Sequence, residues 1–116
     1  MKRSLSIIMA AAVAAACTVT AGAEGSELVV LGDSITSGYG LDGYVSGDNY
    51  SAAGSFANML GTDFGGYENL AVDGRTSGEL LTALEDADIA AALAGADTVV
   101  ISIGGNDFLQ PMISAV

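Results

Sequence analysis

The chain is short and acidic: its 116 residues carry 14 acidic side chains, three basic ones and no histidine, for a net charge of −11 at pH 7. This negative field repels phosphate backbones, so we exclude nucleic acid as an expected partner. A single cysteine, Cys17, excludes an internal disulfide, and the length allows one domain at most.

The amino terminus has the three regions of a secretory signal in their usual order. Met1-Lys2-Arg3 is charged, residues 5–16 are apolar, and Ala21-Gly22-Ala23 is a small-residue cleavage site. We therefore predict a signal peptide over residues 1–23 and a secreted mature domain over residues 24–116. The mature domain would keep one cation against all 14 acidic residues, a net charge of −13.

Two other fates of the amino-terminal segment stay open. The small residues before Cys17 resemble a bacterial lipobox without its usual leucine, so lipid attachment at Cys17 is one alternative. An uncleaved anchor is the other, although the uncharged run of residues 4–23 is mostly alanine and makes a marginal span. After processing we expect no stable membrane span.

Behind the signal, the first predicted elements are a strand and a helix separated by a polar loop. Residues 28–31 form a continuous apolar run, which is typical of a strand buried on both faces. Residues 52–60 predict a helix with Ser51 as its N-cap. Its apolar face, by spacing, would comprise Phe56, Met59 and Leu60.

A weaker strand is predicted at residues 67–72, and a capping box from Thr76 to Glu79 begins the next helix. The apolar residues of that helix are Leu80, Leu81 and Leu84.

Asp86 or Asp88 then caps a further short helix that ends at Gly95. Residues 98–103, β-branched at five of six positions, predict the clearest strand. The alternation of strands and helices predicts an α/β fold with a parallel sheet, right-handed crossovers and helices on both faces.

Three turns follow the predicted strands: Gly32-Asp33-Ser34-Ile35, the segment from Asn69 to Gly74, and Gly104-Gly105-Asn106-Asp107. Parallel sheets bind ligands at the carboxyl ends of their strands, so these turns are expected to meet at one edge. Each turn alone also has a structural explanation, as a helix cap or as a site of positive φ.

Together the three turns resemble the first three conserved blocks of the GDSL-type, or SGNH, hydrolases, in the order and approximate spacing of that family. The resemblance covers residues 28 to about 109, and residues 34–41 are most similar to its thioesterase and lysophospholipase-like branch. It implies a three-layer α/β/α fold with a parallel, flavodoxin-like sheet, and hydrolysis of carboxylic esters or thioesters through a serine acyl-enzyme.

The resemblance also implies a role for each of three residues. Ser34 would be the nucleophile, and an oxyanion hole would be formed by the backbone N–H groups of Ser34 and Gly74 and the side-chain amide of Asn106. Asp33 is interpreted as a turn residue and not as the base. No cofactor and no metal is expected, and the expected partner is a small-molecule ester or an acylated saccharide or lipid.

The chain departs from the family pattern in lacking the Asp-x-x-His block, because it contains no histidine. A serine without a base is a poor nucleophile, so we expect a fragment that lacks the carboxyl-terminal part of its domain and is catalytically silent alone. The strand at residues 98–103 is then expected to have a bare edge. A secreted binding module without catalysis, on the same fold, is the alternative function.

The polar loop carries Tyr39, Tyr44 and Tyr50, which would lie beside Ser34. These side chains are interpreted either as a rim that contacts sugar or acyl groups, or as scattered aromatics of a solvated loop.

Overall fold

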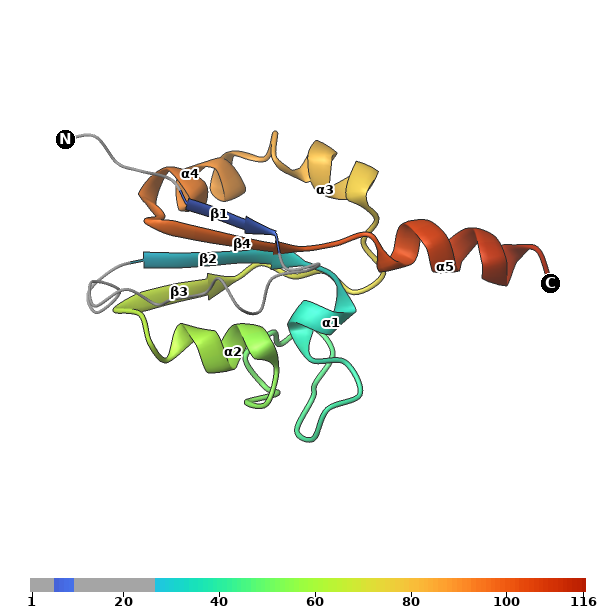
Figure 1. Ribbon diagram of the computed structural model, residues 1–116, viewed down its shortest axis with the longest axis horizontal. Helices are drawn as coiled ribbons and strands as arrows, with labels where there is room; N and C mark the ends of the chain where they lie inside the picture. Colours follow the sequence, from blue (N-terminus) through green and yellow to red (C-terminus); the bar gives the residue numbers. More distant parts are fainter. Residues whose placement is uncertain (1–5, 10–26) are drawn as a thin grey trace.

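A parallel sheet with helices on both faces makes up the computed structural model, which describes residues 6–9 and 27–116 (Figure 1). The strand order is β1-β4-β2-β3, and all pairings are parallel. The elements are β1 (Ser6–Met9), β2 (Glu27–Gly32), α1 (Ser34–Ser37), α2 (Phe56–Gly61), β3 (Gly66–Asn69), α3 (Ser77–Ala83), α4 (Ala87–Gly95), β4 (Thr98–Ser102) and α5 (Gly105–Ser114). The predicted α/β class and three layers are confirmed.

Strand β2 contributes to two hydrophobic cores, one on each face of the sheet. Val29 and Leu31 pack with Leu80 of α3, on the face covered by α3 and α4. Leu28 and Val30 pack with Ala57 of α2 on the opposite face. A central parallel strand has no solvent-facing side, which is why residues 28–31 are apolar without alternation.

The predicted caps of α3 and α4 are confirmed. The Thr76 hydroxyl accepts from the Glu79 N–H, and the Glu79 carboxylate accepts from the Thr76 N–H, as a capping box requires. Asp86, rather than Asp88, caps α4 by accepting from two backbone N–H groups. Leu80 is buried, whereas Leu81 and Leu84 are exposed.

The helix predicted at residues 52–60 begins later, at Phe56. Ser55 is its N-cap and accepts from the Asn58 N–H, whereas the Ser51 hydroxyl is engaged with the backbone of the preceding loop. Of the three residues assigned to its apolar face, Phe56 and Leu60 pack on the core, whereas Met59 is 61% exposed.

Two strands are shorter than predicted, and one helix was not expected. β3 ends at Asn69, although Leu70 and Val72 still donate to β2 carbonyls at 2.9 and 3.0 Å. β4 ends at Ser102. Where turn residues predicted a loop, Gly105–Ser114 forms α5, which extends from the carboxyl end of the sheet (Figure 1).

In the full chain the edge of β4 is covered, whereas the bare edge was predicted for the mature domain of residues 24–116. β1 pairs with β4 in parallel, from Ser6 opposite Thr98 to Met9 opposite Ile101. The covering strand comes from the segment with the features of a secretory signal. Cys17 and the predicted cleavage site at residues 21–23 lie outside the described residues, and in the described part of the chain no helix is long and apolar enough to cross a membrane.

Deleting residues 1–23 should turn a monomeric chain into a self-associating one. The deletion removes β1 and leaves the uncharged strand β4 with unpaired backbone groups on one side. Sedimentation velocity at several concentrations measures this. Adding Thr98→Lys to the shortened chain is the matched variant, because a lysine on an edge strand opposes pairing and should restore the monomer. A shortened chain that stays monomeric at every concentration would contradict the prediction.

Candidate active site

The first turn places Ser34 at the start of α1, directly after β2. The buried carboxylate of Asp33 caps this helix by accepting from the Ile35 N–H at 3.0 Å, which confirms Asp33 as a turn residue. Ser34 is half-buried. Within the described chain no group accepts from its backbone N–H, as expected for the first residue of a helix.

Gly32 allows α1 to lie close against the end of β2. A Cβ at this position would come within 2.0 Å of the Thr36 hydroxyl and 2.6 Å of the Ser102 carbonyl oxygen. Thr36 is fully buried, and its hydroxyl finds no hydrogen-bond partner in the described part of the chain. Any side chain at position 32 would therefore displace the helix that carries Ser34.

The second turn presents the backbone of Gly74 to solvent. Arg75 N–H donates to the Val72 carbonyl at 3.1 Å, and Gly74 has a φ of +77°, the value of the third residue in a type II turn. No acceptor for the Gly74 N–H is found among the described residues. Glycine is required here because the φ is positive, as the sequence suggested.

The third turn leads from β4 into α5 and places Asn106 in the first turn of that helix. The Asn106 amide donates to the Arg75 carbonyl at 3.0 Å, and Gln110 donates to the Gly74 carbonyl at 2.7 Å. An amide has two N–H groups, so Asn106 keeps one for another acceptor.

Contacts between the turns show that all three meet at the carboxyl edge of the sheet, where α1 and α5 also lie (Figure 1). Val72 N–H donates to the Gly32 carbonyl, which joins the second turn to the first. Asn106 and Gln110 join the third turn to the second. A Cβ on Gly105 would lie 3.8 Å from the Asp33 carboxylate, which brings the third turn beside the first.

A network of amides, of which Asn58 and Asn69 are buried and Asn49 is half-buried, holds this edge together. The Asn69 side chain is 3% exposed and donates to the Thr36 carbonyl at 3.1 Å. The Asn49 amide donates to the carbonyls of Asn69 and Ala71, both at 2.8 Å. Asn58 donates in turn to the Asn49 carbonyl at 2.9 Å. These bonds fasten the loop between α1 and α2 to the end of β3.

Sequence reasoning missed Asn49 and Asn58 in this network, and it missed Gln110. Asn58 bonds to Asn49, nine positions away, Asn49 bonds to residues 20 and 22 positions away, and Gln110 contacts a residue 36 positions away. Asparagines in a polar loop give no signal of such contacts, because the same residues serve ordinary turns.

Asp107 ties the start of α5 to the start of α3. Its carboxylate accepts from the hydroxyl and the backbone N–H of Ser77 at 2.6 and 2.9 Å. These two hydrogen bonds hold the pKa of Asp107 below its ordinary value of 3.8.

Acidification should weaken the contact between Asp107 and Ser77. The folded pKa is depressed, so its stabilisation is present above about pH 3.8 and is lost as the pH falls through the folded value. Asp107→Asn should therefore lower the urea midpoint at pH 6, and this difference should shrink below pH 4. Asp63→Asn, an exposed substitution, is the control. A difference that stayed constant from pH 6 to pH 2 would contradict the assignment.

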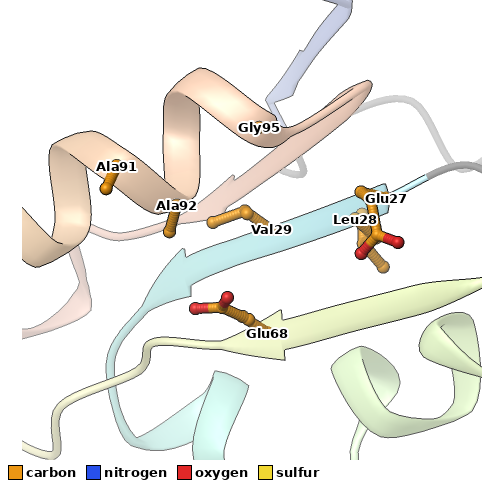
Figure 2. A pocket seen from close by; sticks show the side chains of 7 residues that line it. All are labelled: Glu27, Leu28, Val29, Glu68, Ala91, Ala92 and Gly95. Carbon is orange, nitrogen blue, oxygen red and sulfur yellow. The ribbon is translucent and has the colours of Figure 1, made fainter.

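A separate pocket lies away from this edge, between α4 and the strands β2 and β3 (Figure 2). Its lining contributes two carboxylates, from Glu27 and Glu68, and no nucleophile. In the described residues no group of acidic, cysteine or histidine side chains could hold a metal ion. The three turns therefore remain the best candidate site.

Comparison with known proteins agrees with this geometry. The family model described as "GDSL-like Lipase/Acylhydrolase family" matches residues 30–115, which include all three turns. No curated protein and no solved structure matches the chain significantly. The match covers most of the sequence, and the parallel sheet with its three turns is the fold expected of SGNH hydrolases. The chain belongs to the GDSL-like lipase/acylhydrolase family.

Proposed function

We propose that Ser34 is the nucleophile, and that Ser34, Gly74 and Asn106 form the oxyanion hole, of a secreted serine hydrolase that cleaves carboxylic esters or thioesters. The observation that carries the proposal is the meeting of Ser34, Gly74 and Asn106 on three turns that contact one another. Family membership supports ester hydrolysis in general. The signal-like amino terminus supports secretion.

In the proposed reaction, the Ser34 hydroxyl attacks the ester carbonyl carbon and loses its proton to a base. The carbonyl oxygen becomes an oxyanion, which accepts hydrogen bonds from the N–H groups of Ser34 and Gly74 and from the Asn106 amide. The alcohol or thiol then leaves with a proton from the base, and water releases the acyl group from Ser34.

The proposed base is a histidine, which the 116 residues do not contain. In the family it belongs to an Asp-x-x-His block, and we propose that the same block completes this site from outside the printed sequence. We use the name histidine-bearing enzyme for the protein in which Ser34, Gly74 and Asn106 act together with the histidine of that block. The printed chain alone is expected to hydrolyse no ester at a measurable rate.

The substrate surface beside the nucleophile is partly apolar. Ile35 and Tyr39, which follow Ser34 along the chain, are 64% and 69% exposed. We propose that they contact the acyl chain or the alcohol of a lipid or an acylated saccharide.

Steady-state hydrolysis of a series of aryl esters and thioesters by the histidine-bearing enzyme tests this proposal. The expected result is turnover that varies with the length of the acyl group. A protein that binds these esters but hydrolyses none would support the alternative of a binding module.

A further inference from the structure

We infer that Asp73 is a positioning residue, whose carboxylate ties the loop of residues 39–50, here the tyrosine loop, to α1 and so fixes the turn that presents Gly74. The effect of Asp73 on catalysis rests on the proposed function, because Gly74 is a proposed oxyanion donor. The contacts themselves can be tested without any catalytic activity.

Both oxygens of the Asp73 carboxylate are engaged, each by a different segment. Oδ1 accepts from the hydroxyl of Ser37, the last residue of α1. Oδ2 accepts from the phenol of Tyr44, in the middle of the tyrosine loop. Hydrogen bonds to an ionised carboxylate are stronger than those between neutral groups. One exposed side chain thus joins three segments at the active-site edge.

Ser37 provides the fixed end of this arrangement. It is 1% exposed, and its hydroxyl also lies 3.1 Å from the Ser34 carbonyl oxygen. A hydroxyl has one proton, and the charged acceptor, Asp73, competes for it more strongly. Asp73 is therefore attached to the same short helix that begins with the nucleophile.

Tyr44 also contacts Tyr39, which follows the nucleophile by five residues. Its ring meets the ring of Tyr39 edge to face, with centroids 5.3 Å apart. Tyr39 N–H donates to the Ser34 carbonyl at 2.9 Å. The far part of the loop has its own anchor, because Asn49 is bound to the end of β3. Asp73 therefore holds the middle of the loop, whose first residue, Tyr39, is bonded to Ser34.

The same restraint acts on the turn that contains Gly74. Asp73 is the second residue of that turn, and its carbonyl carbon belongs to the peptide group whose N–H is that of Gly74. Fixing the Asp73 side chain on both oxygens limits rotation of this peptide group. A donor held in place before the reaction costs no reorganisation when the oxyanion forms.

The phenol of Tyr44 supplies a spectroscopic signal for the contact. The hydrogen bond to Asp73 is the largest cause of a raised pKa at Tyr44, since the carboxylate accepts from the neutral phenol and repels the phenolate. Desolvation of the phenol also raises this pKa, a hydrogen bond with Ser46 lowers it, and the charge of Tyr39 raises it. Within the described residues the one basic side chain is that of Arg75, and its guanidinium donates to the Leu70 carbonyl at 3.4 Å.

The first experiment is a titration of tyrosine absorbance at 295 nm on the full chain. Asp73→Ala should move one titration down toward the ordinary tyrosine pKa of 10.0, and Tyr44→Phe should remove that same titration. Asp42→Ala, which removes a charge from the same loop, should leave it in place. An unchanged titration in Asp73→Ala would overturn the contact.

The second experiment measures how rigid the turn is, by NMR relaxation on the same chain. The backbone order parameter of Gly74 should be about 0.85 in the parent chain and fall below about 0.6 in Asp73→Ala. Tyr44→Phe removes one of the two contacts and should give an intermediate value. Asp73→Asn keeps one acceptor oxygen and replaces the other with an NH2 group, which can donate to a hydroxyl oxygen, so both contacts can persist and most of the rigidity should be preserved. A Gly74 order parameter that is equal in all four proteins would overturn the positioning role.

The catalytic consequence is measured in the histidine-bearing enzyme. Asp73→Ala should lower kcat at least about tenfold, because a displaced donor loses much of its stabilising effect, while Asp73→Asn recovers most of the rate. A mobile Gly74 combined with an unchanged kcat would count against the proposed donor role of Gly74, and not against the contact made by Asp73.

Discussion

Ser34→Ala should lower the turnover of the histidine-bearing enzyme by about 10⁶-fold, the largest effect that we expect from any single substitution. The hydroxyl that forms the acyl-enzyme is lost, and neither the oxyanion donors nor the base can replace it. Initial rates on a short-chain aryl ester and on a thioester measure the effect. Ser34 is half-buried at a helix start, so circular dichroism and the midpoint of urea unfolding should change little.

Ser114→Ala, at the exposed end of α5, is the matched control and should keep the parent rate. Residual activity within a factor of about ten of the parent in Ser34→Ala would show that another group performs the attack.

Asn106→Ala should lower turnover by roughly 10²- to 10³-fold, or about 3 to 4 kcal/mol of transition-state stabilisation. The substitution removes a donor that acts on the oxyanion and leaves the nucleophile and the base in place. It should therefore lower kcat and change KM much less. Initial rates over a range of substrate concentrations separate the two constants.

Asn106 also donates to the Arg75 carbonyl, so a purely structural loss has to be separated from a catalytic one. Gln110→Ala is suited to this, because it removes a comparable bond from α5 to the Gly74 carbonyl at 2.7 Å. Its turnover should stay within about threefold of the parent. Equal losses in the two variants would mean that Asn106 only holds α5 against the second turn.

The central strands could be predicted from the sequence because their environment dictates their composition. β2 and β4 lie between two layers of helices, and residues 28–31 and 98–101 are accordingly apolar or β-branched without alternation. The caps of α3 and α4 could also be predicted, since Thr76 and Asp86 bond to residues two or three positions away.

Two elements could not be predicted, each for a physical reason. β1 pairs with residues about 90 positions away, and the same apolar segment reads as a signal for export. α5 was missed because it contains Pro111, which is uncommon inside a helix, although its apolar residues Phe108, Leu109, Met112 and Ile113 recur at helical spacing. Glycines at positions 104 and 105 favoured a loop there instead.

The sequence predicted the three turns of the candidate site but not the side chains that connect them. Its three turns were found because each follows a strand, and parallel strands bring their carboxyl ends to one edge. The side chains that connect the turns were not found, because Asp73 and Gln110 reach partners 29 to 36 residues away. Such contacts depend on how the loops fold back, which local patterns do not specify.

Covalent labelling tests most directly the claim that the three turns form one serine-hydrolase site. The histidine-bearing enzyme is incubated with a fluorophosphonate, whose phosphorus is attacked by an activated serine with loss of fluoride, and the adduct is located by peptide mass spectrometry. We predict a single adduct on Ser34, slowed strongly by Asn106→Ala. Labelling of a different serine, or no labelling in a protein that hydrolyses esters, would contradict the account.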